Sequence, residues 1–278
     1  MVADEPMEKY ASFRHFPASG DESQRCQLII VPDKSDMTRA AMQKLIPLLE
    51  DRAISCWIFA AGNTQADLYK EIRERYSSHF KNRHAIGLDE YIRSSSDEKG
   101  ENLRSFNDTN LFNHIYMPGK NIHWPPSEII GDPKFAISRY RDELNTYGPA
   151  NIAILGLGAN GHIGFNEPGS EAHSTRESRV RIVPLTEETR KRNGVTFKKA
   201  ITMGIADILE SERIILMASG RDKAEALAKA FDPKFPQSSD CPASFLRDHR
   251  NLIVIADEDA ASKLPRESEF RNLFTLRD

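Results

Sequence analysis

The chain has 278 residues, of which 39% are hydrophobic and 28% charged, so it can bury the core of one large domain. Its formal net charge of −3 does not favour nucleic acid as a partner. No apolar stretch reaches the length of a membrane span, and residues 1–25 lack the apolar segment of a secretory signal. Cys26, Cys56 and Cys241 are widely spaced, which is typical of reduced thiols. We therefore expect a cytoplasmic protein without a membrane segment, with a polar N-terminal extension at 1–25 and a single domain at 26–278.

Strands and helices are expected to alternate along the chain. Apolar, often β-branched runs predict strands at residues 27–31, 54–59, 84–88, 213–218 and 251–256, another opening at Ile152, and one near an edge at 179–185. Helical spacing predicts helices at residues 35–51, 66–77, 102–112, 132–147, 186–193 and 243–248, and one opening at Lys223. Ser35 and Asp132 are the expected N-caps of the first and fourth helices. This alternation predicts a three-layer α/β fold around a mainly parallel sheet.

The strand that opens at Ile152 runs into a glycine-rich loop. Glycines allow the main chain to approach a ligand closely, and this loop also holds His162 and Glu167, two groups that can transfer protons. Ligands of open α/β sheets bind beyond the carboxyl ends of the strands. The pattern therefore indicates a catalytic loop, with an ordinary tight turn as the alternative.

The loop carries a recognisable motif, GHIGFNEPG at residues 161–169. It resembles the signature of the glucosamine-6-phosphate deaminases, also called glucosamine-6-phosphate isomerases. The related 6-phosphogluconolactonases share the Gly-His step and lack the Phe-Asn-Glu-Pro continuation. The resemblance extends from about residue 28 to about residue 264. It implies a modified doubly wound, Rossmann-like fold, a sugar phosphate as substrate and no cofactor, and it leaves a homo-oligomer open.

A second motif, Asp-Glu-Tyr at residues 89–91, follows the strand at 84–88. Two adjacent acids are often a solvated turn. Here they match a motif of the same family, in which the first acid is the base that transfers a proton. Neighbouring side chains of an extended segment point in opposite directions, so only one of them should face a substrate. The match selects Asp89.

Two loop-to-helix turns are candidate phosphate sites. Gly62, Asn63 and Thr64 precede a helix whose free N–H groups suit an anion, although Asn63 or Thr64 could simply cap that helix. The resemblance favours the phosphate, with Asn63 standing where the family has a second glycine. Lys223 lies in the first turn of another helix, where a cation opposes the dipole unless an anion shares the site. It matches the phosphate-binding lysine of the family.

The helix at 186–193 corresponds to a mobile lid in the family. The lid brings a basic residue onto the substrate phosphate, and Arg192 is the candidate here. A solvated charged face is the alternative.

The resemblance also implies the chemistry. The substrate would be an amino-sugar 6-phosphate, and glucosamine 6-phosphate would give fructose 6-phosphate and ammonia. His162 would open the sugar ring, and Asp89 would move a proton from C2 to C1. Glu167 would orient His162 and tune its charge. Asn160, which stands where several members have aspartate, can hydrogen-bond His162 without stabilising imidazolium by charge. Gly161 completes the implied substrate-binding set.

Two alternatives stay open at this stage. The first is a related enzyme for another hexosamine phosphate or for 6-phosphogluconolactone; the Phe-Asn-Glu-Pro run argues against the lactonase, whereas Asn63 and the short lid leave other hexosamines open. The second is a non-catalytic sugar-phosphate sensor. Such a regulator should carry a helix-turn-helix, and residues 1–25 are too short and polar for one. The sequence shows no metal-binding motif, so no metal is expected.

Overall fold

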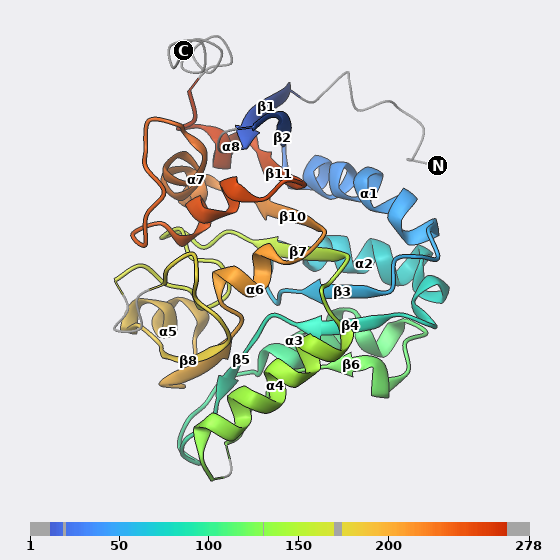
Figure 1. The fold of residues 1–278 in the computed structure, drawn as a ribbon, viewed down its shortest axis with the longest axis vertical. Helices are drawn as coiled ribbons and strands as arrows, with labels where there is room; N and C mark the ends of the chain where they lie inside the picture. Colours follow the sequence, from blue (N-terminus) through green and yellow to red (C-terminus); the bar gives the residue numbers. More distant parts are fainter. Residues whose placement is uncertain (1–11, 19–20, 130, 170–173, 266–278) are drawn as a thin grey trace.

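The computed structural model describes residues 12–18, 21–129, 131–169 and 174–265. An eight-stranded sheet with the order β1-β2-β11-β10-β7-β3-β4-β6 forms its centre (Figure 1). All neighbouring strands from β2 to β6 are parallel, and β1 pairs antiparallel with β2. The strand bounds are β1 Ser12–Ala18, β2 Asp21–Val31, β3 Cys56–Phe59, β4 His84–Gly87, β6 Ile122–His123, β7 Ile152–Gly156, β10 Arg213–Ala218 and β11 Leu252–Asp257. The predicted mainly parallel α/β sheet is thus confirmed.

Helices cover both faces of this sheet (Figure 1). The α-helices are α1 Lys34–Glu50, α2 Ala66–Arg75, α3 Leu103–Asn110, α4 Pro133–Tyr147, α5 Glu187–Asn193, α6 Ile205–Leu209, α7 Ala224–Phe231 and α8 Glu258–Ala261. Short 3-10 helices are η2 Ser77–Phe80, η3 Phe112–His114, η4 Gly119–Asn121, η5 Arg221–Lys223 and η6 Pro242–Asp248. None of the helices in the described ranges is long and apolar enough to cross a membrane.

The central strands are apolar on both faces because each face is covered. In β7, Ile152 and Ile154 pack into one core with α1 and α2, and Ala153 and Leu155 pack into the other with α4, α6 and α7. This alternation is the two-residue period of a strand, and burial on both sides explains why the sequence reads as a continuous apolar run.

The starts of two helices correct one expectation and confirm another. Asp33, and not Ser35, is the N-cap of α1, because its side chain accepts a hydrogen bond from the Asp36 N–H. The α4 helix begins as predicted, with Asp132 as N-cap and Pro133 at the first position.

The first strand of the sheet begins earlier than the apolar pattern indicates. The expected strand at 27–31 is the second half of β2, which pairs with β1 in a hairpin. Residues 12–18 and 21–25, expected in a polar extension, therefore add backbone hydrogen bonds at the sheet edge. The boundary at residue 26 between extension and domain stays a prediction, and residues 1–11 and 19–20 lie outside the described residues.

A second, antiparallel sheet lies beside the edge of the first sheet at which the parallel strands have their carboxyl ends. Its order is β5-β9-β8, with the bounds β5 Asp89–Ile92, β9 Lys199–Thr202 and β8 Arg181–Pro184. The edge position expected for residues 179–185 is confirmed, because among the described strands β8 pairs with β9 alone. A small core of aromatic and aliphatic side chains, including Tyr91, Phe165 and Phe197, supports this sheet.

Candidate active site

The candidate residues lie on loops that leave four neighbouring strands. The order β10-β7-β3-β4 places the carboxyl ends of these strands side by side. Lys223 follows β10, His162 follows β7, Thr64 follows β3 and Asp89 follows β4. Since the carboxyl ends of parallel strands share one edge, the sheet topology gathers the predicted residues at the edge where α/β proteins bind ligands.

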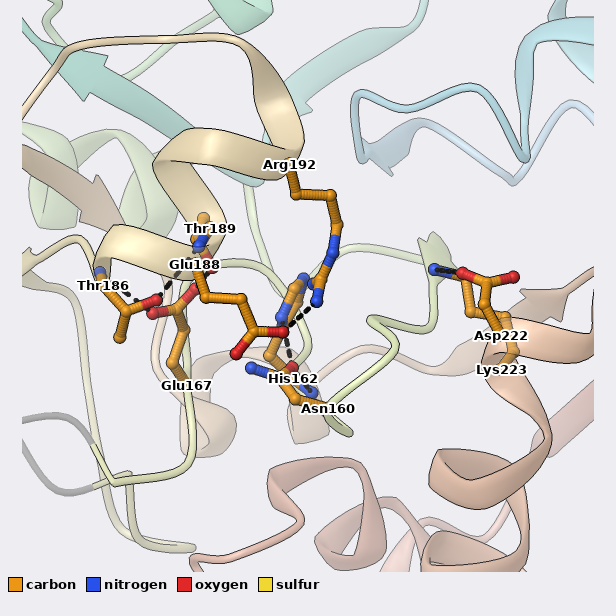
Figure 2. Close-up of polar contacts among 9 residues, drawn as sticks. All are labelled: Asn160, His162, Glu167, Thr186, Glu188, Thr189, Arg192, Asp222 and Lys223. Atoms are coloured by element: carbon orange, nitrogen blue, oxygen red, sulfur yellow. Dashed lines mark hydrogen bonds and ion pairs between the residues drawn. The ribbon is translucent and has the colours of Figure 1, made fainter.

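His162 is held by Asn160. The Asn160 Oδ1 atom accepts hydrogen bonds from the backbone N–H of His162 at 3.2 Å and meets its Nδ1 at 2.6 Å (Figure 2). Because the backbone N–H can only donate, the Asn160 atom is an acceptor, so Nδ1 carries the ring proton. The neutral imidazole therefore keeps its lone pair on Nε2, which is the form required of a general base.

The surroundings keep this imidazole neutral. Enclosure by the protein, followed by the charges of Arg192 and Lys223, lowers the pKa of His162 to about 4. Figure 2 shows the Arg192 side chain extending from α5 toward the imidazole. Two cations from separate segments thus act on one ring, and a positive potential of this kind also suits an anionic ligand.

Asp89 is a buried carboxyl with 5% of its surface exposed. Burial, and then the neighbouring charge of Glu90, raises its pKa to about 8. Its Oδ2 lies against Gly164, where an added Cβ would approach it to 3.2 Å. Gly164 is two residues beyond His162, so the structure brings the two predicted proton-transfer groups to the same loop. A carboxyl whose pKa lies near the working pH is suited to accept and return a proton.

Glu167 does not contact His162 in the described part of the chain, which corrects its expected role as the orienting partner of the imidazole. Its buried carboxylate instead accepts hydrogen bonds from the Thr189 hydroxyl and, at 3.4 Å, from the Thr186 N–H (Figure 2). Both threonines belong to the start of α5, where Thr186 is the N-cap. Asn160 takes over the contact with His162, and Glu167 anchors the expected lid helix.

The α5 helix is also fixed at its other end. The Asn193 amide donates to the Tyr91 hydroxyl at 2.9 Å, so the Asp-Glu-Tyr segment holds the last turn of α5. Within the helix, Arg192 pairs with Glu188, and the two side chains are 33% and 67% exposed. Arg192 is therefore not simply part of a solvent-exposed charged face, because its charge also lowers the pKa of His162.

The candidate phosphate residues belong to two turns, one at residues 62–64 and one at Lys223. Among the described residues, no hydrogen bond or ion pair joins these two turns. Gly62 and Thr64 are half-buried, Asn63 is exposed, and the N-cap residue Gln65 makes no side-chain capping bond among the described residues. Neither Asn63 nor Thr64 acts as the cap, which removes the simple alternative. Lys223 has 16% of its side chain exposed and pairs with Asp222 at 3.1 Å (Figure 2).

Several motif residues shape the loop, and two of them, Gly158 and Asn166, were not assigned a role from sequence. A Cβ at Gly158 would lie 2.4 Å from the His162 ring, and Gly161 adopts φ of 86° with its back against Cys241. Asn166 is fully buried, and its amide donates to the carbonyls of Ile163 and Met203 at 2.8 Å. These contacts explain why the loop needs glycine and asparagine. They place Gly161 beside His162 as a structural neighbour, and its substrate contact stays a prediction.

Thr202 was also missed as a site residue. Its hydroxyl accepts from the Phe165 N–H at 3.2 Å, and it lies opposite Asp89 in the β5–β9 register. The available signal was the segment Ile-Thr-Met-Gly at residues 201–204, which resembles a Leu-Thr-x-Gly pattern of the same family. In the described residues, no group of three or more His, Cys, Asp or Glu side chains is arranged to hold a metal ion.

The fold and this edge define an α/β enzyme of the sugar-phosphate isomerase type. The chain belongs to the family of glucosamine-6-phosphate isomerases/6-phosphogluconolactonase, whose model matches residues 32–255. The resemblance drawn from the sequence motifs is thereby confirmed.

Individual relatives agree with this assignment. The chain is 37% identical over 262 residues to glucosamine-6-phosphate deaminase of Pseudoalteromonas translucida, covering 88% of this chain and 92% of the relative. It is 35% identical over 244 residues to the deaminase of Oceanobacillus iheyensis, covering 84% and 94%. The structure of a monomeric glucosamine-6-phosphate deaminase superposes with a TM-score of 0.76 at 31% identity, covering 85% and 99%. A 6-phosphogluconolactonase from Trypanosoma brucei shares the fold, with a TM-score of 0.72 at 16% identity over 87% of this chain and all of that one, 100%.

Proposed function

We propose that the protein converts glucosamine 6-phosphate and water into fructose 6-phosphate and ammonia. The observation that carries the proposal is the closeness of the buried Asp89 carboxyl to Gly164 in the His162 loop, where an added Cβ would lie 3.2 Å from Asp89 Oδ2. It joins a proton-transferring acid and a neutral imidazole at one place, as an aldose-to-ketose isomerisation with deamination requires. The names of the relatives support the same activity.

The reaction begins with ring opening. The Nε2 lone pair of His162 takes the proton from the C1 hydroxyl and returns a proton to the ring oxygen as the ring bond breaks. Asn160 holds the ring in the tautomer that leaves Nε2 free. The amide provides orientation and no compensating charge, so the imidazole returns readily to its neutral form.

Proton transfer at carbon follows on the open chain. The Asp89 carboxylate removes the C2 proton and delivers it to C1 while a proton passes from the C2 amine to the C1 oxygen, giving the ketose skeleton with an imine at C2. Water adds to that carbon and the amine leaves as ammonia, which balances the reaction. The burial that raises the pKa of Asp89 makes the ionised carboxylate a strong base.

The phosphate is assigned to the cationic region. Lys223 and Arg192 supply the positive charge that acts on His162, and the turn at Gly62, Asn63 and Thr64 supplies N–H groups at the start of α2. Glu167, through Thr186 and Thr189, holds α5 so that Arg192 stays over the site. A cytoplasmic location and a homo-oligomer remain predictions for this chain.

An ammonia-release assay tests the proposal. Glucosamine, galactosamine and mannosamine 6-phosphates are compared at equal concentration, and hydrolysis of 6-phosphogluconolactone is measured in parallel. We expect ammonia from glucosamine 6-phosphate and fructose 6-phosphate in equal amount. Turnover of another hexosamine phosphate alone, or of the lactone alone, would favour a related enzyme. Saturable sugar-phosphate binding without any turnover would favour a sensor.

A further inference from the structure

The second acid of the Asp-Glu-Tyr motif is the buried group that the reaction above does not use. Glu90 has no exposed surface, 0%, and its side chain leaves β5 on the face opposite Asp89. Its Oε1 accepts the N–H groups of Tyr91 at 2.7 Å and Leu103 at 2.9 Å, and its Oε2 accepts the N–H of Arg104 at 2.9 Å. A buried carboxylate with three backbone donors is held in one place.

These contacts join β5 to the beginning of α3. Leu103 and Arg104 are the first two residues of α3, whose N-cap Asn102 makes no side-chain capping bond among the described residues. Glu90 therefore supplies the acceptor that this helix start requires, and the N-terminal dipole favours its negative charge. The free N–H groups of the helix and the carboxylate satisfy each other inside the protein.

We propose that Glu90 is a positioning residue for the carbon proton transfer, acting through Asp89 by fixing β5 against α3 and by placing a second buried carboxyl group beside the base. The inference rests on the proposed function, because it assigns Asp89 the transfer between C2 and C1. Glu90 itself touches no reacting atom.

The charges around Asp89 support this assignment. Glu90 is the charged group that raises the pKa of Asp89 after burial itself. The other titratable groups that sense the Asp89 charge are Tyr69 of α2, Tyr91 of β5 and Tyr140 of α4, whose own pKa values are raised so that they stay neutral. In the part of the chain that the structure describes, burial and Glu90 are the causes of the raised pKa of Asp89, and no cation is among them. When Glu90 is ionised, its like charge at the neighbouring residue therefore makes Asp89 a stronger base.

The experiment compares Glu90→Gln with a matched variant, Glu98→Gln. Glu98 is also buried, at 6% exposure, and accepts the N–H groups of Ser94, Ser95 and Lys198 at 2.5, 3.1 and 3.2 Å. Glu98 is not among the groups that raise the pKa of Asp89. Both variants lose one buried carboxylate with three backbone donors, so both report the structural cost of that loss.

Exchange of the substrate C2 proton with solvent is measured against pH for the wild type and both variants. For Glu90→Gln we expect the acid limb of the exchange rate to move down by about one pH unit or more, the high-pH rate to fall, and KM to change less than twofold. For Glu98→Gln we expect the limb to stay in place. A limb that stays in place in Glu90→Gln, or moves equally in both variants, would overturn the inference. Wild-type enzyme without any C2 exchange would instead refute the proposed function.

A measurement on the wild type covers the case in which Glu90→Gln fails to fold. The protein is labelled with ¹³C at its aspartate carboxyls, and the Asp89 signal is identified as the one missing from Asp89→Asn. If Glu90 acts on Asp89, that signal shifts in two steps as the two neighbouring acids titrate. A single step at the ordinary pH of an exposed aspartate would overturn the inference.

Discussion

Replacing Asp89 by asparagine should increase the stability of the protein at high pH while removing its activity. The change keeps the size of the side chain and removes its charge. In the folded protein the pKa of Asp89 lies at about 8, against an ordinary value of 3.8. Since each pKa unit corresponds to about 1.4 kcal/mol, the ionised carboxylate costs on the order of 5 kcal/mol of folding free energy above pH 8.

The sign follows from proton binding. The folded pKa lies above the unfolded one, so between pH 4 and pH 8 the folded state binds more protons than the unfolded state. The free energy of unfolding therefore decreases as pH rises through this window, by up to about 1.4 kcal/mol per pH unit from this group. Asp89→Asn lacks the titrating group and escapes this decrease.

Urea denaturation of both proteins at pH 5, 6, 7 and 8 and constant ionic strength measures the effect. The unfolding free energy of the variant minus that of the wild type should grow steadily with pH. In the same variant, exchange of the C2 proton should fall by ~10²–10⁴ while a substrate analogue still binds. Asp97→Asn, at an exposed position, is the control and should show no such growth. A difference between variant and wild type that stays constant from pH 5 to pH 8 would refute the argument.

Four further substitutions test the other assignments. His162→Gln should slow turnover of the cyclic amino sugar far more than the reverse reaction from the open-chain ketose; equal losses in both directions would contradict a ring-opening role. Asn160→Asp should raise the pKa of His162 and move the acid limb of the rate profile upward, and an unchanged limb would count against the Asn160–His162 contact. Lys223→Ala should weaken binding of phosphorylated ligands by ~1.5–3 kcal/mol, measured by calorimetry, with little change for the unphosphorylated sugar; equal loss for both would exclude a phosphate contact. Thr189→Val removes the hydroxyl that donates to Glu167, so KM should rise several-fold from a less firmly held lid helix, and an unchanged KM would show that this contact does not position the lid.

Local sequence patterns were sufficient for the regular elements and for the place of the site. The β10 strand has the predicted bounds, 213–218, and α4 begins at the predicted Asp132 cap. Both the bounds of β10 and the start of α4 depend on residues that are close together in the sequence, so the sequence alone indicates them. The motif at 161–169 likewise located the loop, because the chemistry of its residue types is visible without a structure.

The partners of the buried polar groups were decided only by tertiary structure. Glu167 bonds to Thr189, 22 residues away, and Glu90 bonds to Leu103, 13 residues away. No local period records which of several donors will be near a buried carboxylate, since this depends on how β5, α3 and α5 pack. The expected Glu167–His162 pair was wrong for this reason, while the Asn160–His162 pair, two residues apart, could be foreseen.

The reactivity of the site shows the same division. The sequence alone determined that an aspartate, a histidine and a lysine each follow a strand of a mainly parallel sheet. The tertiary structure decided that Asp89 is buried beside Glu90, which raises its pKa. It also decided that Arg192 of α5 and Lys223, which is the N-cap of α7 and not a residue of its first turn, act on His162 and lower its pKa. The residue type determines which groups can transfer protons. Their pKa values depend on burial and on nearby charges, and these come from segments far apart in the chain.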